Sequence, residues 1–281
     1  MGIVANFAYC AIDGEERKTR HRAKVVPCHL YQKLVESEAF DLREALRSLD
    51  FLDTAIVRTE RFVAIIMHVK QLTLVGVRGT QFAYDWLINL RATKSSASSG
   101  QSFHSGFYLE AKKLAQLMED HLKPEIPVYV GGHSLGAAVA AILSQDENLP
   151  QPKACYMYGS PRASNAPLLP SVQPFAHRRN LDVVPHCPPR GLDYSNFKDQ
   201  RRFDGSVFQA ADSIEFYFFL QWLATLALSS FPANHAMESY LHEIIETVST
   251  HTEIAEHWRD RSKYWSDNVR RFGYPLALKE K

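Results

Sequence analysis

Two apolar segments in the first third of the chain have the composition of β-strands. Residues 61–69 are mostly apolar or β-branched, and residues 72–77 repeat that composition after a break at Lys70 and Gln71. Short β-branched runs bounded by polar residues are typical of strands. Because the break between them is short, we expect the two strands to pair as a hairpin.

Longer segments carry apolar residues every three or four positions, which is the spacing of one face of a helix. This periodicity predicts three helices, over residues 29–49, 82–90 and 107–122. A last long helix is expected near the end of the chain, over residues 237–258. By contrast, residues 92–101 are rich in Ser, Thr and Ala, a composition that predicts a flexible linker.

Three short apolar runs lie between the helical segments and predict further strands, at residues 126–131, 154–159 and 174–178. Residues 186–205, rich in proline, charge and glycine, predict a surface loop or an edge hairpin. Strands and helices thus alternate from the first hairpin onward. Such alternation predicts an α/β fold with a mostly parallel central sheet flanked by helices. No internal linker divides the pattern, so residues 1–281 are expected to form a single domain.

One glycine-flanked serine stands where a predicted strand meets a predicted helix. Residues 132–136 read Gly-His-Ser-Leu-Gly, and small and apolar residues follow at 137–143. A serine in a G-x-S-x-G segment between strand and helix lies on a sharp, strained turn at the C-terminal edge of the sheet. Ser134 is therefore predicted to be a nucleophile, with the backbone N–H of Leu135 placed to stabilise an oxyanion. The alternative is a glycine turn with an incidental serine.

A nucleophilic serine needs a neighbouring base and a carboxylate that orients the base. In α/β enzymes with such a serine, the acid and then the histidine follow in the sequence. Asp182 is the predicted acid because it follows the strand at 174–178, and active sites of parallel sheets lie at that edge. A turn-capping role for Asp182 stays open. The other acids downstream lie in the polar loop and are interpreted as solvated charges; they are Asp193, Asp199 and Asp204.

His235 is the predicted base. It lies in a short loop between a long apolar run and the last predicted helix, and loops on a rigid scaffold often carry catalytic groups. Three further histidines fall inside that helix and are interpreted as ordinary surface or core residues; they are His242, His251 and His257. His177 lies within a predicted strand, and His186 follows Asp182 too closely for this chain order.

Composition narrows the class of protein. Of the 281 residues, 46% are hydrophobic and 22% charged, as in ordinary soluble globular proteins. The net charge is +1 and the basic residues form no stripe, so nucleic acid is not expected as a partner. The four cysteines show no paired or metal-type spacing, and residues 1–20 lack the features of a Sec-type signal. A cytoplasmic or membrane-peripheral location is therefore expected, with export by another route left open.

Seven short motifs, in the same order, resemble those of the class 3 lipase family, which includes the triacylglycerol lipases of filamentous fungi. The motifs are VRGT at 77–80, DWLINL at 85–90, HSGF at 104–107, GHSLG at 132–136, GSPR at 159–162, DVVP at 182–185 and HAMESY at 235–240. The chain departs from the family where Ala137 replaces a usual glycine and where residues 186–234 do not match the fungal pattern. The secretion signal and disulfides of the fungal enzymes do not appear either.

The resemblance implies an α/β-hydrolase fold and ester hydrolysis without a metal or an organic cofactor. It implies that Ser134 is the nucleophile, His235 the base and Asp182 the acid that orients the base. It also implies an oxyanion hole formed by Thr80, through its backbone and hydroxyl, together with the backbone N–H of Leu135.

The resemblance further places a lid over residues 81–92. A lid helix covers the active site with its apolar face in water and turns that face toward lipid at an interface. The side chains suited to this exchange are Phe82, Trp86, Leu87 and Leu90. The alternative is a helix that stays docked on the protein.

A second apolar segment, at residues 210–232, is expected to cap the site. Its core at 214–231 is long enough as a helix to approach the thickness of a bilayer. It contains Glu215 and Gln221, however, and a spanning helix would pull His235 away from Ser134. We therefore expect either a buried helix over an acyl pocket or a membrane-facing cap, and each favours long-chain or lipid esters.

These observations together predict a serine ester hydrolase, a lipase acting on acylglycerols through an acyl-enzyme intermediate, with peripheral contact at a lipid interface. Three other ester hydrolases use the same triad and stay open as alternatives: a phospholipase A1, a galactolipase and a general carboxylesterase. A non-enzymatic alternative is a lipase-like scaffold that binds a partner. Loss of a triad residue would favour the scaffold, but all three candidates are present.

Overall fold

A computed structural model of the chain describes residues 1, 5, 8, 53–69, 71–79, 93–97, 99–168, 174–179, 182, 184–197, 200–201, 235, 237, 240 and 243–244. The helices predicted at 29–49 and 82–90 and the apolar segment 210–232 lie outside these residues. Within the part of the chain that is described, no helix combines the length and the apolar character needed to cross a membrane.

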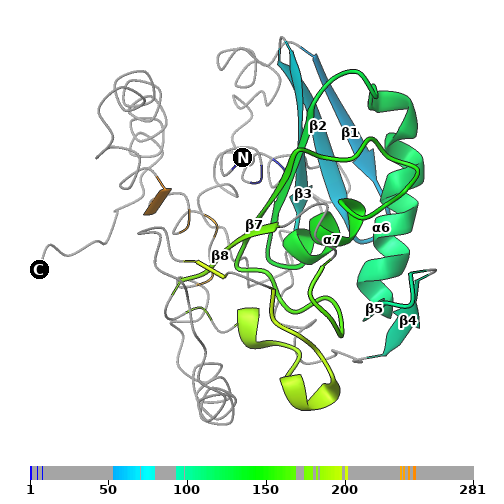
Figure 1. Cartoon of the computed structure of the whole chain (residues 1–281). Coiled ribbons are helices and arrows are strands. Elements are labelled where there is room, and N and C mark those ends of the chain that lie inside the picture. The colour runs from blue at the N-terminus through cyan, green and yellow to red at the C-terminus, as the bar shows by residue number, and fades with distance from the viewer. Residues whose placement is uncertain are drawn as a thin grey trace, which may run out of the picture.

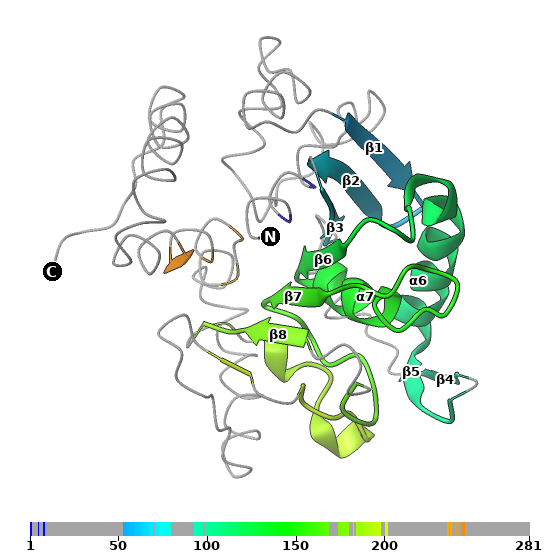
Figure 2. The same cartoon turned by 45° about the horizontal axis from the view of Figure 1, so that its top comes forward.

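A six-stranded sheet forms the centre of the described structure (Figure 2). Its strands lie in the order β1-β2-β3-β6-β7-β8. Their bounds are β1 Asp53–Arg58, β2 Val63–Val69, β3 Leu72–Arg78, β6 Val128–His133, β7 Ala154–Tyr158 and β8 Pro174–His177. The pairs β3–β6, β6–β7 and β7–β8 are parallel, whereas β1–β2 and β2–β3 are antiparallel. The α/β fold with a mostly parallel sheet is therefore confirmed.

The hairpin predicted at the start of the sheet is confirmed, since β2 and β3 pair antiparallel from Val69 opposite Leu72 to Val63 opposite Arg78. Strand β1 was not predicted. It is an edge strand that exposes Ile56 and buries Val57. Its place in the sheet comes from pairing with β2. Pairing with a strand elsewhere in the chain cannot be predicted from the residues of β1 alone.

Two helices pack on one face of the sheet (Figure 1). Helix α6 spans Ser105–Met118 and is extended by a short 3₁₀ turn, η2, at Glu119–His121; helix α7 spans Leu135–Leu143. The apolar face predicted over 107–122 is confirmed, since its residues are buried whereas Leu109 and Leu117 on the other side are exposed. The buried residues are Phe107, Ala111, Leu114, Ala115, Met118 and Leu122.

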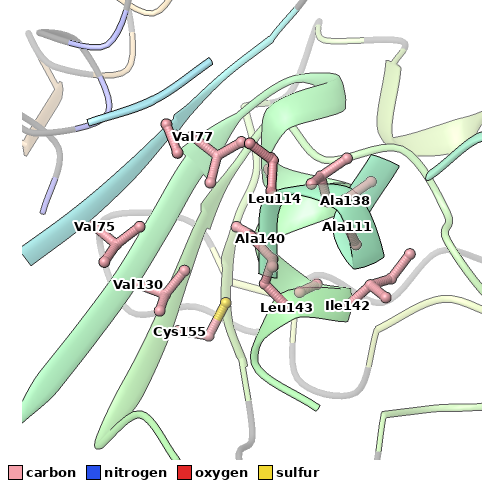
Figure 3. Close-up of a cluster of buried hydrophobic side chains, with 14 of the residues drawn as sticks. Val75, Val77, Ala111, Leu114, Val130, Ala138, Ala140, Ile142, Leu143 and Cys155 are labelled. Carbon is pink, nitrogen blue, oxygen red and sulfur yellow. The ribbon is translucent and has the colours of Figure 1, made fainter. Parts of the chain in front are cut away.

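Helix α7 is buried along its whole length. Figure 3 shows its residues Ala138, Ala140, Ile142 and Leu143 between the sheet and α6. Alanine or glycine at five of its nine positions lets the helix axis approach the strands closely. Each larger apolar side chain buried here contributes about 1.5–3 kcal/mol, so the core holds this helix firmly behind β6.

The flexible linker expected at 92–101 is wrong. Strands β4 (Lys94–Ser96) and β5 (Ser102–His104) form an antiparallel hairpin there. Gly100 closes the turn with φ +81°, a conformation that glycine adopts without the steric cost borne by other residues. A serine-rich composition indicates exposure to solvent, but it does not prevent the backbone of these residues from forming the hydrogen bonds of a strand pair.

The surface loop expected over residues 186–205 is anchored to the core within its described part. Two short 3₁₀ turns, η4 at Val184–His186 and η5 at Arg190–Leu192, open the segment. The buried Arg162 guanidinium donates to the main-chain carbonyls of His186 and Pro188, at 2.6 and 2.7 Å. Phe197 packs in the hydrophobic core. The polar composition of the segment therefore did not indicate that it is attached to the core by Phe197 and by the Arg162 hydrogen bonds.

Candidate active site

Ser134 forms the whole connection between strand β6 and helix α7. The strand continues to His133, two residues beyond its predicted end, and the helix begins at Leu135. Ser134 has φ 58° and ψ −131°, a backbone conformation that is costly for a residue with a side chain. Its N–H donates to the carbonyl of Tyr158 on β7, at 2.9 Å, which fastens the turn to the neighbouring strand.

Two glycines allow the backbone around Ser134 to pack this tightly. A Cβ on Gly136 would lie 2.4 Å from the carbonyl oxygen of Val77, and one on Gly132 would lie 2.5 Å from the carbonyl oxygen of Gly136. Both distances are far below van der Waals contact, and the opposing atoms belong to the backbone. The elbow therefore requires glycine at both positions.

One of the predicted oxyanion donors, Leu135, lies beside this contact. Leu135 is the first residue of α7, and helix geometry leaves the first N–H groups without partners inside the helix. The chain at the end of β3 reaches the same place, because a Cβ on Gly136 would lie 2.7 Å from the nitrogen of Gly79. Thr80, the next residue, lies outside the described residues.

His235 is buried and contacts both predicted partners. Its Nε2 lies 2.7 Å from Oγ of Ser134, and its Nδ1 lies 2.9 Å from Oδ2 of Asp182. A carboxylate only accepts hydrogen bonds, so Nδ1 carries the proton and Nε2 accepts from the serine hydroxyl. This is the tautomer that a general base needs. The structure thus brings Ser134, His235 and Asp182 together from positions 53 and 101 residues apart in the chain.

Asp182 accepts three hydrogen bonds in a fully buried position. Besides the His235 ring, the hydroxyl of Tyr240 donates to Oδ2 at 2.5 Å, and the N–H of Val184 donates to Oδ1 at 3.0 Å. Burial by itself would raise the pKa of Asp182, but the charge of His235 and these hydrogen bonds hold that pKa below its usual value. The bond from Val184 closes a local turn, so the turn-capping role and the contact with His235 coexist.

Tyr240 is a site residue that reasoning about acids and bases missed. Its hydroxyl donates to Asp182 and accepts from the N–H of Arg179, at 3.3 Å. Burial first, and then the neighbouring carboxylate, raises the pKa of Tyr240 well above its usual value. The only available signal was its fixed place in the HAMESY motif.

Gly159 at the end of β7 makes room for this cluster. Its φ is +58°, and a Cβ there would lie 2.6 Å from Oδ2 of Asp182 and 3.0 Å from the hydroxyl of Tyr240. Any side chain would therefore displace the carboxylate from His235.

Of the other residues discussed from the sequence, some lie in the described part of the chain and some lie outside it. The lid residues lie outside the described residues; they are Phe82, Trp86, Leu87 and Leu90. Asp193, interpreted as a surface charge, pairs with Lys94 at 2.5 Å. His177 stacks on Tyr158, with ring centroids 5.4 Å apart. Among the described residues, no group of three or more His, Cys, Asp or Glu side chains is arranged to hold a metal.

Comparison with known proteins finds a match to one protein family. A sequence model of the family described as lipase (class 3) matches residues 74–192, a range that contains Ser134 and Asp182. Two curated relatives, the secreted mono- and diacylglycerol lipases A of Penicillium cyclopium and Penicillium camembertii, are each 28% identical to this chain over 162 residues. Those alignments cover 52% of this chain and 52% of each relative. The chain thus spans about half the length of the curated relatives it matches.

The fold is shared with a solved structure. The triacylglyceride lipase of Rhizomucor miehei is 20% identical, with a TM-score of 0.50, and the alignment covers 84% of this chain and 93% of that one. Together with the sheet described above, this similarity confirms the α/β-hydrolase fold.

The expected location is contradicted by the relatives. Both curated relatives are named as secreted lipases, whereas a cytoplasmic or membrane-peripheral location was predicted. The prediction rested on a missing signal pattern and on unpaired thiols. Both are absences of a local pattern, and such an absence does not by itself fix a compartment.

Proposed function

We propose that this chain, whose residues 74–192 match the class 3 lipase family model, is a serine ester hydrolase that acts on acylglycerols. The observation that carries the proposal is the continuous hydrogen-bonded chain from Ser134 through His235 to Asp182. The first member of this series of hydrogen bonds, Ser134, lies on a positive-φ turn at the C-terminal edge of parallel strands. Active sites of such sheets lie at that edge.

In the proposed mechanism, Oγ of Ser134 attacks the ester carbonyl while Nε2 of His235 takes the hydroxyl proton. Asp182 stabilises the imidazolium that forms, because its buried carboxylate faces Nδ1. The N–H of Leu135 and the Thr80 segment stabilise the negative oxygen of the tetrahedral intermediate. His235 then gives its proton to the departing alcohol, which leaves an acyl group on Ser134.

Deacylation repeats the same proton transfers with water. Nε2 of His235 accepts a proton from a water molecule as that water attacks the acyl carbonyl. The second tetrahedral intermediate collapses, Ser134 recovers its proton from His235, and the carboxylic acid leaves. The site residues supply all proton transfers, so the proposal invokes neither a metal nor an organic cofactor.

Three features support an acylglycerol rather than a small polar ester. The curated relatives are named mono- and diacylglycerol lipases, and the Rhizomucor miehei protein is a triacylglyceride lipase. In this chain, the proposed lid at 81–92 and the apolar segment at 210–232 would present hydrophobic side chains around the site. Such side chains would also bring the enzyme to a lipid interface.

The decisive experiment compares Ser134→Ala with Ser144→Ala on a panel of tri-, di- and monoacylglycerols, phospholipids, galactolipids and short synthetic esters. Removing the nucleophile of a serine hydrolase lowers kcat by about 10⁶-fold, so Ser134→Ala should be inactive on every ester. Ser144 is a matched control, because it is a buried serine at the opposite end of α7. Wild-type turnover in folded Ser134→Ala protein would refute the proposal.

The same panel separates the alternatives. Acylglycerols should give the highest kcat/KM, with a rise in rate above the solubility limit if the 81–92 segment acts as a lid. Preference for phospholipids or galactolipids would favour those hydrolases instead. A maximum at acetate esters would favour a general carboxylesterase, and absence of turnover on all esters would favour the partner-binding scaffold.

A further inference from the structure

His133 lies beside the nucleophile but contacts the base. It is the last residue of β6, directly before Ser134, and its side chain is buried. Its Nε2 lies 2.6 Å from the main-chain carbonyl oxygen of His235, which is 102 residues away in the sequence. The two imidazole rings also face each other, with centroids 4.7 Å apart and an interplanar angle of 30°.

The direction of this hydrogen bond follows from its acceptor. A carbonyl oxygen cannot donate, so the proton must sit on Nε2 of His133. Burial first, and then the nearby charge of His235, lower the pKa of His133 to about 3. The ring is therefore neutral at the pH where lipases work, with its single proton committed to the carbonyl of His235.

His235 is consequently held from two directions. Asp182 accepts from Nδ1 and so sets the rotation of the ring, whereas His133 binds the main chain from which that ring projects. The Ser134 hydroxyl and the base must meet at hydrogen-bond distance for proton transfer. Since His133 and Ser134 are consecutive residues, any movement of the elbow carries both the nucleophile and the anchor of the base.

We propose that His133 is a positioning residue that donates from Nε2 to the main-chain carbonyl of His235 and thereby keeps the base in register with Ser134. This role rests on the proposed esterase function. It differs from simple space filling, although the ring also packs edge-on against Tyr240, with centroids 5.7 Å apart. A space-filling ring needs volume, whereas a positioning ring needs a donor at one particular atom.

The test uses two amide substitutions that differ only in reach. In glutamine, Nε2 is as many bonds from Cβ as Nε2 of histidine, so His133→Gln can keep the donor. In asparagine, the amide nitrogen ends at the position of Nδ1, so His133→Asn cannot reach the carbonyl of His235. We expect kcat on a soluble ester to fall about 10- to 100-fold in His133→Asn with KM nearly unchanged, and to stay within about threefold of wild type in His133→Gln.

Rates are taken per active site, titrated with an irreversible alkyl phosphonate that reacts with Ser134, so that misfolded protein is not counted. Equal kcat per site in the two variants, or a loss that appears only in KM, would overturn the proposal. Failure of the wild-type protein to hydrolyse any ester would instead refute the proposed function, which keeps the two outcomes distinct.

A measurement on the wild-type protein tests the same proposal if the variants do not fold. Imidazole ¹⁵N chemical shifts distinguish the two neutral tautomers of a histidine. The spectrum should contain one histidine, assigned to His133, that stays in the Nε2–H tautomer from pH 5 to 8. A His133 signal of the Nδ1–H tautomer, or one that titrates near pH 6.5, would overturn the proposal.

Discussion

The two sides of the candidate active site are built differently. On the nucleophile side, Ser134 stands between β6 and α7, where Gly132 and Gly136 let backbone pack against backbone. On the acid–base side, Asp182 and His235 are held mainly by side-chain hydrogen bonds, including the one from Tyr240. One side is thus fixed by steric fit and the other by polar contacts.

This difference predicts how each side fails. Added volume should damage the nucleophile side, since no flexible side chain is available to move away. Removal of a polar atom should damage the acid–base side, because a buried group left without its partner bears the cost of desolvation. Substitutions of each kind therefore test whether the division is real.

Among the tests of this division, the largest expected effect comes from Asp182→Asn, which changes polarity without changing shape. The amide cannot stabilise an imidazolium, and its NH₂ group favours the tautomer in which Nδ1 accepts. We expect kcat to fall by about 10⁴-fold, as in serine hydrolases with this substitution. Steady-state kinetics on a soluble ester measure the loss. Asp193→Asn, at the exposed ion pair with Lys94, is the matched control and should keep full activity.

Gly136→Ala should be the most damaging change of volume. The added Cβ would meet the Val77 carbonyl oxygen at 2.4 Å, so the free energy of unfolding should fall by about 3 kcal/mol despite the better helix propensity of alanine. Urea denaturation measures this change. The control is Gly191→Ala, where a Cβ meets nothing within 4 Å. If both variants unfold at the same urea concentration, the steric account of the elbow is wrong.

Tyr240→Phe removes one of the donors to Asp182 and leaves the ring in place. The pKa of Asp182 should rise because one hydrogen bond to its charged form is lost. We expect kcat to fall about 10-fold and the free energy of unfolding to fall by about 1–3 kcal/mol. Tyr194→Phe is the control, since that hydroxyl donates to the carbonyl of Thr93 over a long distance of 3.5 Å. Unchanged kcat in Tyr240→Phe would remove Tyr240 from the site.

The effect that is smallest per residue and per pH unit concerns acid stability. Burial lowers the pKa of His133 to about 3 and that of His177 to about 4. The unfolded chain therefore binds more protons than the folded protein below about pH 6.5, and stability falls as the pH drops from there toward the folded pKa values. Each residue contributes at most about 1.4 kcal/mol per pH unit within its window.

Urea titrations at pH 7, 6, 5, 4 and 3 measure this slope. Asp182 adds a separate loss at lower pH, because its depressed pKa contributes stability above about pH 3.8 that disappears as the pH falls through the folded value. His177→Leu should flatten the slope between pH 6.5 and 4 while leaving that acid loss in place. An identical slope in wild type and His177→Leu would show that this ring is not buried in its neutral form.

Local sequence predicted the nucleophile side well. The strand composition of β2 and β3 and the glycine pattern around Ser134 all depend on neighbours within a few residues. Strand β1 and the β4–β5 hairpin were missed because their backbone pairing, rather than their composition, decides their structure. The donors from Tyr240 to Asp182 and from His133 to His235 were missed for the same reason.

The sequence by itself determined that Ser134 lies between a strand and a helix, with a glycine two positions away on each side. Those properties follow from the local cost of backbone conformations and from the period of apolar residues. Only the tertiary structure decided that Asp182, His235 and Tyr240 meet at that serine. Their contacts close loops of 53 to 101 residues, and the free energy that closes such loops comes from the packed core rather than from the residues that meet.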